Sequence, residues 1–157
     1  MSPRTRKATA SDIPVIVAML APHARAGRAL PRTHRSVAED LRDWTVAIIG
    51  GRIVGAASVG LVDVDLAEIG VVVGQDDDTE SGLIDAILSE AGALGVSRIF
   101  VATDDPAPYE AWGFQQRPVA TIPEKRDRQC LRCPRMPRCL KVALDRDVAM
   151  APLRAVG

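Results

Sequence analysis

The stretch from Leu66 to Gly95 limits most strongly how this chain can fold. It begins with an apolar run that ends in three valines, which is typical of a buried strand. Apolar residues then recur at helical spacing from Leu83 to Leu94, and Gly95 stands where a helix would end. The sequence therefore predicts a strand, a short loop and a long helix that starts at the loop.

The loop between this strand and this helix is acidic. Gln75 is followed by three aspartates and then, after Thr79, by Glu80. Backbone N–H groups at a helix start usually attract a phosphate, but here four carboxylates and no basic residue surround them. The pattern predicts instead a helix capped by its own side chains, with Asp78 or Thr79 as the cap and Glu80 favouring the helix dipole.

The other predicted elements complete an α+β chain. They are a strand at 4–8, a helix from an N-cap at Ser11 to a stop before Pro22, a helix opened by a Ser36–Glu39 capping box, a hairpin of 45–49 and 53–62 on a Gly-Gly turn, strands at 98–102 and 142–144, and a helical turn at 109–112. A chain of 157 residues is long enough for one full core and short for two. We expect a single domain over 1–157, in which 118–157 is an irregular segment rich in Cys and Arg.

Charge is distributed unevenly along the chain, although the net charge is zero. Residues 53–97 contain nine carboxylates and no Lys or Arg, and the compensating positive charge lies at the two ends. The basic tail lacks the aromatic residues that stack on bases, so we expect it to pair with the acidic middle and not with nucleic acid. No apolar run approaches the ~20 residues of a membrane span, and no signal-peptide segment is visible, so a cytoplasmic protein is predicted.

Three cysteines in the tail, Cys130, Cys133 and Cys139, have a spacing that resembles half of a zinc site. A closed zinc site needs four ligands, and the fourth would have to come from His23, His34 or Asp145. The favoured interpretation is reduced thiols without zinc, since a disulfide is rare in a chain with no export signal.

Several short motifs, together with the order of the elements, point to one family. Tyr109–Phe114 matches a Tyr-x-x-x-Gly-Phe element, and Ala67–Ile69 matches a strand with a central Glu68. These resemble the fifth-strand and fourth-strand regions of the GNAT superfamily of acetyl-CoA-dependent N-acetyltransferases. Leu30–Arg32, and Ile122–Lys125 before the cysteines, are similar to the short glutamate N-acetyltransferases of arginine biosynthesis. The resemblance implies a GNAT fold, in which helices flank a mostly antiparallel mixed sheet.

The resemblance also implies a mechanism and a set of roles. In the family, acetyl-CoA transfers its acetyl group directly to an amine. A base removes the amine proton, which assigns that role to Glu68, and a tyrosine protonates the thiolate, which assigns that role to Tyr109. Backbone N–H groups of the fourth strand, here at Val71 and Val73, polarise the thioester. Arg32 would bind the carboxylate of an amino-acid substrate.

Each of these assignments has a structural alternative that the sequence leaves open. Tyr109 could instead be a core residue packed on Trp112. Glu68 could be a solvent-facing strand residue, and Arg32 a surface residue in a basic loop.

The chain departs from the family at the loop that holds the pyrophosphate of the cofactor. The family pattern is Gln/Arg-x-x-Gly-x-Gly/Ala, in which Gln75 takes the first position and Asp78 and Glu80 replace the small residues. The glycines' freedom to approach the phosphates is lost. One carboxylate about 6 Å from a doubly charged pyrophosphate costs on the order of 1 kcal/mol, and the dipole of the helix returns only about 0.3–1 kcal/mol.

Two functions follow from these observations. The first is acetyl transfer from acetyl-CoA to the amine of a small amino acid such as glutamate. The second is a catalytically inactive GNAT-fold module, without a cofactor, that serves binding or regulation. A zinc or nucleic-acid module built on the tail is the third hypothesis, and a homodimer is compatible with all three.

Overall fold

The computed structural model describes residues 2–118, 122 and 141–149. The chain divides into two compact units, one of Met1–Gly60 with Ile69–Glu90 and one of Leu61–Glu68 with Ala91–Gly157. No helix among the described residues is long and apolar enough to cross a membrane.

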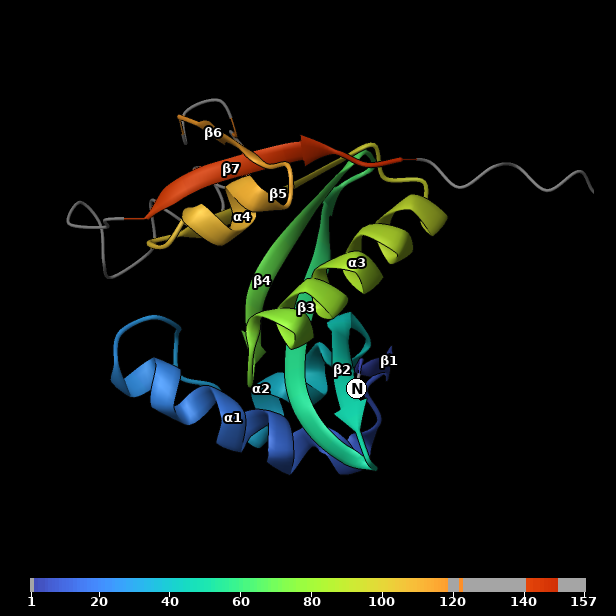
Figure 1. The fold of residues 1–157 in the computed structure, drawn as a ribbon, viewed down its shortest axis with the longest axis vertical. Coiled ribbons are helices and arrows are strands. Elements are labelled where there is room, and N and C mark those ends of the chain that lie inside the picture. The colour runs from blue at the N-terminus through green and yellow to red at the C-terminus, as the bar shows by residue number, and fades with distance from the viewer. Residues whose placement is uncertain (1, 119–121, 123–140, 150–157) are drawn as a thin grey trace, which may run out of the picture. The chain divides into compact units, whose positions relative to one another are not determined.

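The described elements are labelled in Figure 1. The strands are β1 (Arg4–Lys7), β2 (Trp44–Ile49), β3 (Arg52–Asp63), β4 (Leu66–Gly74), β5 (Arg98–Thr103), β6 (Gln115–Arg117) and β7 (Val142–Asp147). The α-helices are α1 (Ile13–Arg25), α2 (His34–Glu39), α3 (Asp77–Ala93) and α4 (Ala107–Ala111), and 3-10 turns lie at Ala10–Asp12 and Leu41–Asp43. The described strands form one sheet in the order β1-β2-β3-β4-β5-β7-β6. The predicted α+β class and mostly antiparallel sheet are confirmed.

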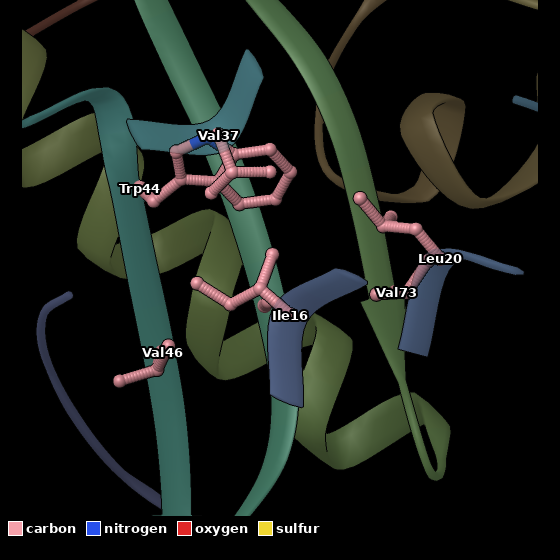
Figure 2. Close-up of a cluster of buried hydrophobic side chains, with 7 residues drawn as sticks. Ile16, Leu20, Val37, Trp44, Val46 and Val73 are labelled. Atoms are coloured by element: carbon pink, nitrogen blue, oxygen red, sulfur yellow. The ribbon is translucent and has the colours of Figure 1, made fainter. Parts of the chain in front are cut away.

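The first unit is built on the β2–β3 hairpin. Gly50 and Gly51 have φ values of 57° and 78°, as a two-residue turn that matches the strand twist requires. The core of this unit contains Ile16, Leu20, Val37, Trp44, Val46, Ala56 and Val73, all nearly inaccessible. Figure 2 shows that α1, α2, β2 and β4 each send side chains into this cluster. The predicted Gly-Gly hairpin is confirmed.

Both predicted helix starts in the first unit are wrong. A capping box of Thr9 with Asp12 opens the 3-10 turn that leads into α1, where Ser11 was expected. The box that opens α2 is Thr33 with Ser36, so Ser36 is the third residue of the helix and not its cap. In both cases a threonine two or three residues earlier takes the extended backbone conformation that a cap needs.

The expected end of the first helix is also wrong, because α1 continues through Pro22 to Arg25. A proline inside a helix removes one hydrogen bond. Helical hydrogen bonding continues beyond it nonetheless, since the backbone N–H of Ala26 donates to the carbonyl of Pro22 at 3.1 Å.

The second unit contains the antiparallel pairs β5–β7 and β6–β7. Its core cluster consists of Leu66, Phe100, Ile122 and Ala143. The last predicted strand, 142–144, is present and extends to Asp147.

The first turn of α3 packs closely on β3 at Gly55. A Cβ at this position would lie 2.7 Å from Cγ2 of Thr79 and 2.9 Å from the carbonyl oxygen of Val73. Because one of these neighbours is backbone, it cannot move aside cheaply. Gly55 therefore fixes how near the start of α3 comes to the sheet.

We predict that Gly55→Ala lowers the free energy of unfolding by roughly 1–3 kcal/mol, because the added methyl overpacks this contact. The matched control is Gly82→Ala inside α3, where a Cβ would meet, among the described residues, only Cγ of Pro3 at 3.4 Å. That change should stabilise the chain by up to about 1 kcal/mol, since alanine is the better helix former. Urea denaturation of both variants tests this, and equal effects would contradict the close contact.

A second prediction concerns Asp12, which is buried at the start of α1. Its carboxylate accepts hydrogen bonds from Nη1 of Arg6 at 2.7 Å and from the backbone N–H of Thr9 at 2.8 Å. These bonds lower the pKa of Asp12 from 3.8 to about 2, and the bond from Arg6 makes the largest contribution. The resulting stability is complete above the unfolded pKa and is lost as the pH falls through the folded pKa.

Asp12→Asn should therefore lower the free energy of unfolding at pH 7 by about 2 kcal/mol and flatten the stability loss between about pH 4 and pH 2. The exposed Asp104→Asn serves as control and should change stability by less than about 0.5 kcal/mol. Circular dichroism across this pH range measures the stability of both proteins. The assignment would be contradicted if Asp12→Asn lost stability between about pH 4 and pH 2 as steeply as the wild type.

Candidate functional site

The start of α3 is capped by Asp76. Its Oδ1 accepts the backbone N–H of Thr79 at 2.8 Å and the hydroxyl of Thr79 at 2.6 Å. The carbonyl of Asp76 accepts the N–H of Glu80 at 3.1 Å, as an N-cap residue should. The prediction of a self-capped helix is therefore right in kind, but its cap is Asp76 and not Asp78 or Thr79.

The other loop residues reinforce this arrangement. The backbone N–H of Gln75 donates to the carbonyl of Val54 at 3.0 Å, and its Nε2 donates to Oδ2 of Asp76 at 3.2 Å. A Cβ on Gly74 would lie 2.8 Å from Cγ of Glu80, so the Glu80 side chain lies over the end of β4. The hydrogen bonds from Thr79 are the main cause of a lowered pKa at Asp76, which keeps this carboxyl ionised.

Charge at this helix start is strongly negative. Asp77, Asp78 and Glu80 lie in the first turn of α3. The two aspartates are exposed and Glu80 is half-buried. The positive end of the helix dipole is thus matched by the chain's own carboxylates.

We predict that Asp76→Ala lowers the midpoint of thermal unfolding by roughly 2–4 °C, because two hydrogen bonds at the cap are lost. Asp77→Ala and Asp78→Ala are the controls, since these side chains favour only the dipole. They should have smaller effects in the same thermal scan. A larger loss in either control than in Asp76→Ala would show that the cap lies elsewhere.

Arg32 lies in the first unit, before α2, with its charge already paired. Its Nη2 donates to Oδ2 of Asp40 at 2.5 Å and to the carbonyl of Ser36 at 3.2 Å. Its guanidinium also lies over the Trp44 ring, 5.6 Å from the centroid. A substrate carboxylate at Arg32 would therefore compete with Asp40.

Asp40, which the sequence analysis did not single out, organises this region. Its second oxygen accepts the indole N–H of buried Trp44 at 3.0 Å, so one carboxylate holds both Arg32 and the core tryptophan. The buried Nε of Arg32 has no hydrogen-bond partner among the described residues. An aspartate four residues before a tryptophan is the only sequence signal for this contact.

The remaining candidates on β4 occupy different environments. Glu68 is half-buried and belongs to the second unit. Val71 is half-buried and Val73 is almost fully buried in the core of the first unit. The side chain of Val73 is thus committed to packing, and a contact to the thioester could come only from its backbone.

Tyr109 belongs to the second unit and is buried on α4. Its ring meets Trp112 edge-on at a centroid distance of 5.2 Å and Phe114 at 5.6 Å. The packing of Tyr109 on Trp112, expected as the structural alternative, is present. The role of Tyr109 as a general acid remains a prediction.

The zinc hypothesis concerns Cys130, Cys133 and Cys139, which lie outside the described residues. Within residues 2–118, 122 and 141–149, no group of three or more His, Cys, Asp or Glu side chains could hold a metal ion.

No family model matches the chain. Among curated proteins, it is 26% identical over 143 residues to an uncharacterised N-acetyltransferase of Chlorobaculum tepidum. The match covers 88% of this chain and 92% of that protein. It is 28% identical over 127 residues to the amino-acid acetyltransferase of Pasteurella multocida. That match covers 77% of this chain but only 29% of that protein.

Among solved structures, N-acetylglutamate synthase from Neisseria gonorrhoeae, complexed with coenzyme A and N-acetyl-glutamate, has a TM-score of 0.83 at 23% identity. The match covers 94% of this chain and 35% of that chain, so this chain spans about a third of the synthase. A Mycobacterium tuberculosis protein in complex with CoA has a TM-score of 0.81 at 20% identity, covering 93% of this chain and 99% of that one.

A GNAT superfamily phosphinothricin acetyltransferase from Sinorhizobium meliloti, in complex with AcCoA, gives a TM-score of 0.74 at 16% identity and covers 99% of this chain and 95% of that one. These likenesses confirm the predicted fold. The sequence resemblance to N-acetyltransferases, amino-acid acetyltransferase included, is also confirmed.

Proposed function

We propose that this chain, which has the GNAT fold and resembles amino-acid N-acetyltransferases, is a module that no longer holds acetyl-CoA in the manner of that family and serves binding or regulation. The proposal concerns present activity and not ancestry. The hydrogen bonds of Asp76 at the start of α3 are the observation that carries it.

A helix start binds a phosphate through backbone N–H groups that have no other partner. Here the N–H of Thr79 already donates to a carboxylate of the chain, at 2.8 Å. A diphosphate would have to displace Asp76 and then lie beside Asp77 and Asp78, which are exposed at the same helix end. Carboxylates this close to a diphosphate oppose its binding by charge repulsion. The favourable interaction of the helix dipole with negative charge is already made by the chain's own carboxylates.

The glycine positions of the family loop add a steric obstacle to the electrostatic one. Asp78 and Glu80 stand there, and the Glu80 side chain lies against Gly74. A backbone that must approach a diphosphate closely favours glycine at such positions. Both effects support the loss of cofactor binding.

Acetyl transfer to the amine of a small amino acid is the second candidate. Its support is the resemblance to the Chlorobaculum tepidum N-acetyltransferase over 88% of this chain. In that case Glu68 would take the amine proton and Tyr109 would protonate the thiolate of coenzyme A. Arg32 would have to exchange Asp40 for the substrate carboxylate.

Calorimetric titration with acetyl-CoA separates the two candidates. We expect no saturable binding by the wild-type chain at roughly 1 mM acetyl-CoA, a concentration at which family-like affinity would be evident. The triple variant Asp77→Arg, Asp78→Gly and Glu80→Gly should gain measurable binding, because it restores small residues and adds a positive charge.

Asp85→Arg is the control for the added arginine, since it makes the same change of charge as Asp77→Arg but on α3 about two turns from the helix start. It should not restore binding. Micromolar binding by the wild type would overturn the proposal in favour of the acetyltransferase. No gain in a folded triple variant would mean that the loss of binding does not arise at the loop.

A further inference from the structure

A hollow of about 630 Å³ lies in the second unit, along β5, β7 and β6. The antiparallel register brings its charged residues together, since Arg98 stands opposite Asp147 and Gln115 stands opposite Asp145. Arg117 and Arg146 also line the hollow. None of these residues has a role in the function proposed above.

Asp145 organises the hollow. It is only 7% exposed, and both of its oxygens are used. Oδ2 accepts Nε and Nη2 of Arg98 at 3.0 and 2.7 Å, and Oδ1 accepts Nε of Arg117 at 3.2 Å. One buried carboxylate therefore fixes two guanidinium groups whose side chains are 40% and 51% exposed.

These guanidinium groups keep unused donors. Nη2 of Arg117 donates to Gln115 at 3.3 Å, whereas Nη1 of Arg98 and Nη1 of Arg117 have no hydrogen-bond partner in the described part of the chain. Arg146 is held by a different group, since its Nη1 donates a hydrogen bond to the carbonyl of Trp112 at 2.7 Å. Among the described residues, three arginines and two aspartates line the hollow, and these five side chains carry one net positive charge.

We propose that this hollow binds a small anion that carries a phosphate or carboxylate group, held by Nη1 of Arg98 and Nη1 of Arg117. Planar guanidinium groups match the oxygens of either group, and charge-assisted hydrogen bonds to them are strong. Asp145 orients both arginines before the anion arrives, so little side-chain entropy is lost on binding. The proposal is independent of whether acetyl-CoA binds.

The test is calorimetric titration of the full chain, in a low-salt buffer free of phosphate, with inorganic phosphate and with succinate as separate probes. We expect saturable binding of at least one probe at concentrations up to roughly 10 mM. Saturation by phosphate alone would identify a phosphate site, and saturation by succinate alone a carboxylate site. Arg117→Gln should weaken the binding by at least about tenfold.

Arg117 is the residue to change because Asp145 keeps its two hydrogen bonds from Arg98 when Arg117 is lost. The control is Arg52→Gln, an exposed arginine at the start of β3, which should leave the affinity unchanged. Should Arg117→Gln fail to fold, the amide resonances of Gly113 and Gln115 in the wild type must shift when the bound probe is added. Absence of saturation by both probes, unchanged affinity in Arg117→Gln, or unshifted resonances would overturn the proposal.

Discussion

The first turn of α3 depends on a contact between a helix and two strands that leaves no room for a side chain. Gly55 and Gly74 let Thr79 and Glu80 come against β3 and β4, and Thr79 is fully buried as a result. The backbone N–H of a buried residue in the first turn of a helix needs a partner, and Asp76 provides one for Thr79 at 2.8 Å. The same geometry that secures the helix thereby occupies the group that would hold an anion.

Under the proposed function, this arrangement would let the fold persist although the loop no longer binds the cofactor. The GNAT likeness extends over most of the chain, at TM-scores up to 0.83, although sequence identity is low. Core packing and strand order do not require the loop glycines. They require only that α3 start close to the sheet, and the capping Asp76 serves that purpose.

Much of the fold could be predicted from the sequence, because local signals and packing agree. The Gly-Gly hairpin and the strand-to-helix stretch are clear examples. The helix starts were missed because Ser11 and Ser36 are good caps in isolation, and the backbone conformation at Thr9 and Thr33 decides between them. The role of Asp145 arises from contacts with Arg98 and Arg117 on neighbouring strands, which no local pattern contains. Asp40 contacts Trp44 and Arg32, which lie close to it in sequence, but their spacing alone does not distinguish a core contact from a solvated carboxylate.

The most direct measurement of the central claim is a nuclear magnetic resonance titration that follows the backbone amides of Asp78, Thr79 and Glu80 as acetyl-CoA is added. The amide of Thr79 should keep the chemical shift of a proton bonded to a carboxylate, and none of the three resonances should move beyond the change caused by added salt. Saturable shifts centred on these amides, with loss of the Asp76 hydrogen bond, would contradict it.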